Sequence, residues 1–335
     1  MHRAPAKIRG RARLSIGFVL ARNFTLSAFA NFIDVVRLAA DEGDRSRPLL
    51  CNWRVLSSTG RPVQSSCGIT VSPDERLSDP TKFDYIVVAG GLIADDVSLD
   101  RESEAFLVHA ANAGVPLVGL CTGALILHQA GLMKGRRCCV SWFHHEDYLR
   151  VSAGLEPGLE PVSDQIFVVD GDRLTCAGGA SAAQLAAYLV DKHVGAAQAR
   201  KSLHIMIIDQ AMSGTATQPG LPLGFDTDDE LVKQALHLMQ QSMFAPRTID
   251  QIAHQLDVSR RNLERRFRRA VDLTPAQADR RLRVAHARFL MATTGRPLAE
   301  VAAETGFCDA SHLIKVFKDF FEQTPDAFRS AARSG

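Results

Sequence analysis

The sequence predicts two domains of different fold class. The first is an α/β domain with a flavodoxin-like parallel sheet and helices on both faces, and the second is an all-α domain with two helix-turn-helix motifs. β-rich apolar runs alternate with amphipathic segments in the first part of the chain, a helix-turn-helix pattern occurs twice near the C-terminus, and a Gly- and Pro-rich stretch separates the two regions. We expect domains over 12–211 and 228–335, a linker over 212–227 and a disordered basic extension over 1–11.

The α/β domain is expected to begin with a buried strand. Leu14–Leu20 is almost wholly apolar, as a parallel strand covered on both faces requires. Basic residues followed by this run also imitate a secretory signal, but Arg22 interrupts the run, so we expect a cytoplasmic protein. An apolar stripe from Leu26 to Ile33 then predicts the first helix. No apolar run approaches the ~20 residues that span a membrane.

Further strands are predicted to end at a common crevice. The predicted strands are Tyr85–Ala89, 116–120 and Arg173–Cys176, with helices over 104–113 and 182–193. Ligands in open α/β sheets bind outside the carboxyl ends of strands, so Gly91, Cys121 and Gly178 should surround one crevice. Asn23, which follows the first strand, and Thr122 are expected at the same ligand site.

The segment Gly119-Leu120-Cys121-Thr122-Gly123 has the spacing of a strand-to-helix elbow that presents a nucleophile. Nucleophilic catalysis also needs a positioned base. His128 lies two turns down the helix and should point away, and the pair His144-His145 has no recognisable active-site context. We therefore interpret Cys121 as a vestigial nucleophile position and predict no catalytic residue. A small residue that closes a pocket, a redox-sensing thiol and the nucleophile of an amidase or hydrolase remain alternatives for Cys121.

Charge and cysteine usage narrow the partners. The net charge of +2 divides unevenly, because residues 245–335 hold 16 Lys and Arg against 11 Asp and Glu, whereas residues 1–244 hold 23 against 26. This asymmetry indicates that a polyanion meets the C-terminal part. The seven cysteines are scattered without a CxxC pair. We expect reduced thiols, no metal and no cofactor.

The C-terminal region contains one supersecondary unit twice, at an offset of 49 to 50 residues. The matched pairs are Ile252-Ala253 with Val301-Ala302, Leu263 with Leu313, Phe267 with Phe317, and Thr274-Pro275 with Thr324-Pro325. We expect helix-turn-helix motifs over about 248–270 and 297–321. A helix over 276–293 would join them rigidly, so that two reading helices could enter successive major grooves about 34 Å apart. The alternative is that the basic stripe is a solvated surface.

The repeat resembles the AraC/XylS family of bacterial regulators. The family signature is matched by Val301-Ala302, Gly306-Phe307, Ser311-His312-Leu313, Val316-Phe317-Lys318 and Thr324-Pro325. By position, the resemblance implies base contacts from Arg261, Glu264 and Arg265 in the first reading helix, and from Ala310, Ser311, His312 and Lys315 in the second. Arg260, Arg268 and Lys318 are further expected DNA-binding residues. Lys315 replaces the usual Arg, and Glu322 or Gln323 stands where Gly is common.

The first domain resembles the class I glutamine amidotransferase-like domain of the PfpI superfamily. The matching landmarks are Ala89-Gly90-Gly91, the elbow around Cys121 and Cys176-Ala177-Gly178-Gly179. Joined to an AraC module, it indicates a GlxA-type regulator. The superfamily's catalytic His is missing, since Thr122 follows Cys121. The acidic residue of the first strand is missing as well.

The resemblance implies an activator that senses a small, nitrogenous metabolite, binds double-stranded DNA, meets RNA polymerase and forms a homodimer. Trp142 and His144 could line a pocket for a cationic head group, beside His145 and Tyr148. Trp142 is equally consistent with a core residue.

Overall fold

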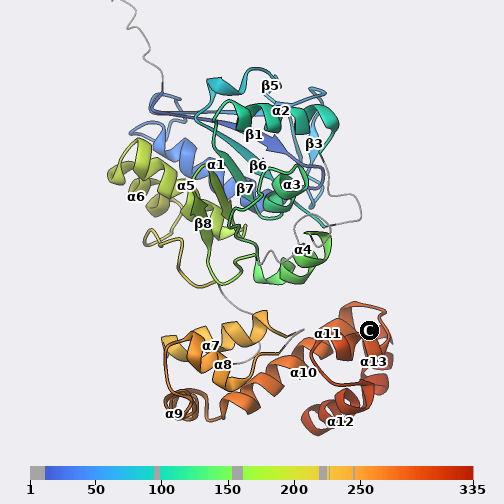
Figure 1. The fold of residues 1–335 in the computed structure, drawn as a ribbon. Coiled ribbons are helices and arrows are strands. Elements are labelled where there is room, and N and C mark those ends of the chain that lie inside the picture. The colour runs from blue at the N-terminus through green and yellow to red at the C-terminus, as the bar shows by residue number, and fades with distance from the viewer. Residues whose placement is uncertain are drawn as a thin grey trace, which may run out of the picture. The chain divides into compact units, whose positions relative to one another are not determined.

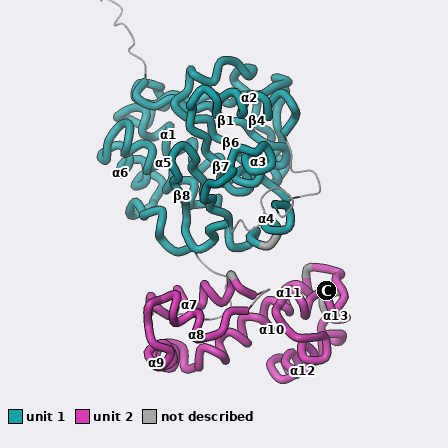
Figure 2. The backbone as a smooth tube through the Cα atoms, in the orientation of Figure 1, with its two compact units in different colours: residues 1–218 teal, residues 219–335 magenta. Residues whose placement is uncertain are grey.

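The computed structural model describes residues 12–93, 99–152, 161–218, 225, 227–243 and 246–334. The chain divides into two compact units, residues 1–218 and 219–335 (Figure 2). The basic extension expected over 1–11 lies outside the described residues, as does most of the linker beyond residue 218.

A seven-stranded sheet with the order β5-β2-β1-β6-β7-β9-β8 forms the centre of the first unit. Its strands are β1 (Leu14–Leu20), β2 (Cys51–Ser57), β5 (Glu75–Arg76), β6 (Tyr85–Ala89), β7 (Leu117–Leu120), β8 (Phe167–Asp170) and β9 (Arg173–Cys176). All pairings are parallel except that of β8 with β9. Every residue of β1 is buried, because both faces of the sheet are covered. A separate hairpin pairs β3 (Val63–Gln64) with β4 (Thr70–Val71).

Helices cover both faces of this sheet (Figure 1). One core contains side chains from α1 (Leu26–Ala39), α5 (Ala180–His193) and α6 (Ala196–Ile205). The other contains side chains from α2 (Arg101–Asn112), α3 (Gly123–Gln129) and α4 (His145–Ser152). Short 3-10 helices lie at η1 (Pro80–Lys82) and η2 (Trp142–His144). The fold class predicted from the sequence is confirmed, with an antiparallel edge strand that we did not predict.

The last residues of the first unit add to the sheet edge. The backbone N–H of Ile166 donates to Ala216, that of Phe167 donates to Gly214, and Gln165 forms a bridge with Thr217. Residues 213–218 thus run beside the edge strand β8 instead of starting a free linker. The linker was expected from residue 212, and the structure places the division between the units after Gln218.

The second unit is all helical. Its helices are α7 (Glu230–Gln241), α8 (Ile249–Gln255), α9 (Arg260–Val271), α10 (Pro275–Thr293), α11 (Leu298–Glu304), α12 (Ala310–Phe321) and α13 (Pro325–Ser334). Figure 1 shows α10 running between two helix clusters, one with α7, α8 and α9 and the other with α11, α12 and α13. Ala278 and Leu282 pack in the first core, and Val284 and Ala287 in the second. The connector is therefore an integral part of both cores.

Candidate functional site

The first helix-turn-helix motif consists of α8 and α9. The Thr248 hydroxyl and the Gln251 side chain form the predicted capping box of α8, and the Ser259 hydroxyl accepts from Asn262 N at 3.2 Å to start α9. Leu263 and Phe267 are fully buried, one turn apart on the inner face of α9. Burial of this face leaves the arginines on the opposite side exposed to solvent.

Two arginines of α9 are tied to neighbouring carboxylates. Arg260 pairs with Asp250 at 3.0 Å and Glu264 at 2.9 Å, which makes Glu264 a partner of Arg260 within the same helix. Arg266 Nε donates to Asp229 at 2.8 Å, although the sequence suggested an exposed side chain. Asp229 also caps α7 by accepting the backbone N–H groups of Leu231 and Val232. The ion pair of Asp229 with Arg266 was not predicted from the sequence.

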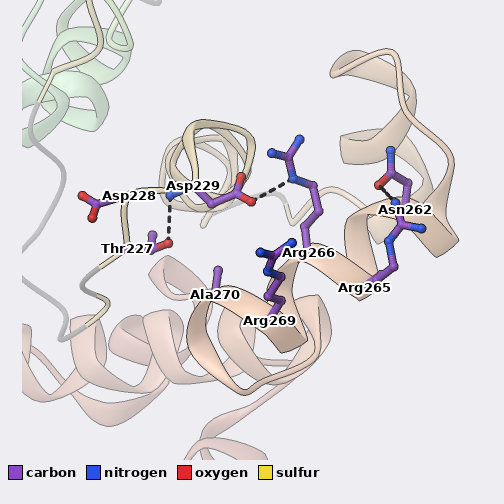
Figure 3. A pocket seen from close by; sticks show the side chains of 8 residues that line it. All are labelled: Thr227, Asp228, Asp229, Asn262, Arg265, Arg266, Arg269 and Ala270. Atoms are coloured by element: carbon purple, nitrogen blue, oxygen red, sulfur yellow. Dashed lines mark hydrogen bonds and ion pairs between the residues drawn. The ribbon is translucent and has the colours of Figure 1, made fainter.

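Figure 3 shows the cavity beside this ion pair, with a volume of about 890 Å³. Arg265 donates to Asn262 Oδ1 at 3.1 Å at one end, and Arg266 extends toward Asp229 at the other. Among the described residues, Arg261 and Arg268 form no ion pair and no side-chain hydrogen bond. These two guanidinium groups, with Arg269 of the cavity wall, are available to an external anion.

The second motif consists of α11 and α12. Leu313 and Phe317 are fully buried, as the repeat predicts, and Asp309 caps α12 by accepting from His312 N at 2.7 Å. Its remaining expected DNA-binding side chains lie on the outer face. Ser311, His312, Lys315 and Lys318 are exposed, and Ala310 is half-buried.

The turns of the two motifs have matching backbone conformations. Asp257 (φ 54°) and Gly306 (φ 69°) occupy equivalent turn positions, and Asp272 (φ 54°) and Glu322 (φ 56°) both end their second helices in the left-handed region. This region favours glycine. Glu322, one of the two residues that the resemblance suggested at the usual glycine position, has this glycine-like backbone conformation.

The two second helices are held apart by α10. This helix has 19 residues, a length of about 28 Å at 1.5 Å per residue. Its N-terminal half packs on the core of α9 and its C-terminal half on the core of α12. The two helix-turn-helix motifs are thus joined by one continuous helix. Such an arrangement suits adjacent turns of a duplex.

In the first unit, the residues predicted around Cys121 fall into one cluster. The Thr122 hydroxyl donates to Gly91 O at 2.8 Å, and a Cβ at Gly91 would lie only 1.7 Å from Asn23 O. Cys121 itself is half-buried with φ 56°, and its Sγ lies 3.5 Å from the Thr25 hydroxyl. A Cβ at Gly178 would approach the Cβ of Cys121 to 2.9 Å. Asn23, Gly91, Thr122 and Cys121 are therefore neighbours, as expected.

No base is in place at Cys121 within the part of the chain that the structure describes: the side-chain hydrogen bond of its Sγ is with Thr25. His128 is buried and its Nδ1 lies 3.2 Å from the Tyr148 hydroxyl. The neighbouring residue Cys176 also belongs to the core, and its burial raises the pKa of its thiol to about 11. The elbow geometry is present without an imidazole to activate the thiol.

The contacts of Trp142 and His144 lie elsewhere. Trp142 N donates to Gln218 Oε1 at 3.0 Å, and the Trp142 ring packs edge-on against Phe143. His144 Nδ1 lies 3.4 Å from Asp147. Tyr148, which the sequence suggested as a pocket residue, is 2% exposed and belongs to the core between sheet and helices. Tyr148 is therefore a core residue and does not line the aromatic pocket that the sequence suggested.

Gln218 is the residue that joins this segment to the end of the unit. Its Nε2 donates to Val140 O at 2.8 Å and to Gln165 O at 2.7 Å, and its Oε1 accepts from Trp142. Its side chain is 4% exposed. A single glutamine in a Gly- and Thr-rich stretch carries no sequence signal for such a role.

Comparisons with known proteins match both units. The DJ-1/PfpI family model matches residues 44–192, and a helix-turn-helix domain model matches residues 252–331. The transcriptional regulator GbdR of Pseudomonas aeruginosa is 29% identical over 93% of this chain and 83% of its own length. The transcriptional regulator GlxA of Rhizobium meliloti is 27% identical over 96% of each chain.

An enzyme is also similar to part of this chain. Isonitrile hydratase of Pseudomonas putida is 31% identical over 40% of this chain and 56% of its own length.

The described residues include no helix long and apolar enough to cross a membrane. The two resemblances predicted from the sequence are confirmed by the family and regulator matches.

Proposed function

We propose that this chain, an AraC-type DNA-binding transcription regulator with a DJ-1/PfpI domain ahead of its helix-turn-helix domain, activates transcription in response to a small metabolite bound by its first domain. It works in the cytoplasm as a homodimer, reads a bipartite DNA site and contacts RNA polymerase. This function does not require Cys121 as a nucleophile.

The observation that carries this proposal is the duplicated presentation of α9 and α12. Each helix buries a Leu and a Phe on its inner face and turns cationic side chains outward. Each is preceded by a short helix with two buried residues, and both are anchored to α10. A solvated basic surface would not need two such frames at a fixed distance.

The site residues have separate proposed roles. Arg261, Arg265 and Lys315 read base edges, with Glu264, Ala310, Ser311 and His312 beside them. Arg260, Arg268 and Lys318 meet phosphates, and Arg260 exchanges its contacts with Asp250 and Glu264 for a phosphate when DNA binds. Lysine presents a point charge rather than a planar fork, so α12 contributes less to base discrimination than α9.

A genome-wide map of bound sites tests this proposal. The wild-type protein should occupy discrete sites, and Arg265→Ala combined with Lys315→Ala should abolish their occupancy. Arg247→Ala is the matched control, because Arg247 is an arginine that hydrogen-bonds to Gln255 outside both reading helices. Equal loss in the control, or unchanged occupancy in the double variant, would contradict the assignment.

The metabolite signal is proposed to pass through the end of the first unit. Gln218 holds Trp142, a predicted effector residue, and is the last residue before the second unit begins. Asp229, early in the second unit, pairs with Arg266 of the first reading helix. A change at either contact would act on a residue that flanks the connection between the units, and this supports coupling between effector and DNA binding.

A cysteine-dependent hydrolase or amidase is the second candidate, favoured by the left-handed backbone at Cys121 and by the similarity to isonitrile hydratase. Turnover of amide substrates that disappears in Cys121→Ala would support it. DNA binding that persists in Cys121→Ala, with an altered metabolite response and no turnover in the wild type, would support the regulator. Ordinary alkylation kinetics of Cys121 in the folded protein would exclude the redox-sensor alternative.

A further inference from the structure

A cavity of the first unit that does not include Cys121 lies at the carboxyl ends of β1 and β2. Its volume is about 580 Å³, within the range of small-molecule sites. Leu20 and Leu56 from the two strand ends line it, and Asp100 and Ser103 from the start of α2 form another wall. The chain passes from β1 outward to β2 on one side and later to β6 on the other, so the cavity lies next to the switch point of the sheet.

Two arginines line this cavity, and no counter-ion for either of them is found among the described residues. Arg22 follows β1 and Arg61 follows β2, and both line the cavity with exposed side chains. Within the described ranges, neither guanidinium forms an ion pair or a side-chain hydrogen bond. Arg54 of β2, by contrast, donates to Trp53 O at 2.8 Å. Two unpaired guanidiniums on one concave surface favour an anion that both can bind.

The carboxylate in the cavity wall is already satisfied. Asp100 Oδ1 accepts from the backbone N–H groups of Glu102 and Ser103, and Oδ2 accepts from the hydroxyls of Ser58 at 3.0 Å and Ser103 at 2.8 Å. Four hydrogen bonds occupy its acceptor sites. Asp100 therefore fixes the end of β2 to the start of α2, and the arginines remain the groups that face a ligand unpaired.

We infer that this cavity, in place of the segment with Trp142 and His144 that the sequence suggested, is the effector site of the proposed regulator, and that its ligand is a small organic anion, held at its carboxylate or phosphate group by Arg22 and Arg61. The inference rests on the proposed function, because it identifies the chemistry of that effector. Leu20 and Leu56 provide apolar walls for a short carbon skeleton. An amino acid meets this description through its carboxylate.

Calorimetric titration of the full chain with acetate, succinate, L-arginine and inorganic phosphate tests the inference. At least one of these anions should bind at one site per chain, and Arg22→Gln and Arg61→Gln should each weaken its binding about tenfold to a hundredfold. Arg54→Gln should leave the affinity unchanged. Because none of the described residues forms an ion pair or a side-chain hydrogen bond with either cavity arginine, the variants should unfold at the wild-type midpoint.

The probes also separate the source of the anionic group. Binding of a carboxylate but not of phosphate identifies a carboxylate effector, and the reverse identifies a phosphate ester. No binding of any probe at millimolar concentration, or an equal loss in Arg54→Gln, overturns the inference. Sequence-specific DNA binding by Arg22→Gln distinguishes that failure from a failure of the regulator proposal, since it does not depend on the cavity.

Discussion

Replacement of Gln218 by Leu should destabilise the first unit, because the side chain satisfies three backbone groups at once. Leucine is close in volume but cannot bond to Trp142 N, Val140 O or Gln165 O. A buried polar group left without a partner costs about 1–3 kcal/mol. Gln165 O keeps a contact with Cys139 Sγ at 3.0 Å, and Trp142 is only half-buried, so we expect a total near 3 kcal/mol rather than the full sum.

Tryptophan fluorescence measures this effect selectively. The chain has two tryptophans, Trp53 and Trp142, and both lie in the first unit, so their emission during thermal unfolding reports this unit within the full chain. A loss of about 3 kcal/mol should lower Tm by roughly 6–12 °C for a domain of this size.

Gln64→Leu is the matched control, because Gln64 is exposed and makes one long hydrogen bond, 3.4 Å to Gly68 O. It should change the free energy of unfolding by less than about 0.5 kcal/mol. If Gln218→Leu unfolds within that same margin of the wild type, Gln218 does not clasp the end of the unit and the proposed signal route fails.

Three further predictions test separate parts of the structure. Arg265→Ala should weaken specific DNA binding by about 1–3 kcal/mol and relax preference at one base pair, whereas Arg268→Ala should weaken all duplexes alike and flatten the salt dependence, both measurable by fluorescence anisotropy. Gly91→Ala should lower the stability of the first unit by more than about 2 kcal/mol, because its Cβ would lie 1.7 Å from Asn23 O, while Gly43→Ala, whose Cβ would come no closer than 3.9 Å to Arg45 Nε, should not. Asp41→Asn should be destabilising at pH 7: backbone hydrogen bonds, the one from Arg47 foremost, hold the pKa of Asp41 below its ordinary range against the opposing effect of burial. That stability is present above the unfolded pKa of about 4 and is lost as the pH falls further, so urea midpoints of wild type and variant should converge in acid; a constant difference would refute this.

The elements with strong periodicity were predictable from sequence. Leu14–Leu20 and Tyr85–Ala89 occur as predicted because a fully buried strand needs an unbroken apolar run. The duplicated Leu and Phe positions predicted α9 and α12, because apolar residues one helical turn apart face the same core. The strand Cys51–Ser57 escaped prediction, since Asn52 and Arg54 interrupt its apolar pattern on partly exposed positions.

Contacts between distant segments were not predictable. Residues 213–218 have the composition of a linker, but their backbone groups pair with strand β8, a choice that depends on the exposed edge and not on side-chain type. Arg266 reads as one more exposed arginine, yet Asp229, remote in sequence, binds it. The arginines of the cavity at the carboxyl ends of β1 and β2 follow different strands, and only the parallel pairing of these strands brings them to one surface.

Selection of bound duplexes from a random library at physiological salt tests the central claim, that α9 and α12 read DNA together at the distance that α10 sets. The recovered sequences should contain two short conserved blocks with centres about 10 bp apart, on one face of the duplex. Insertion of half a helical turn between the blocks should reduce binding to the level of random DNA. Recovery of unrelated sequences, or binding that is indifferent to the spacing, would contradict the account.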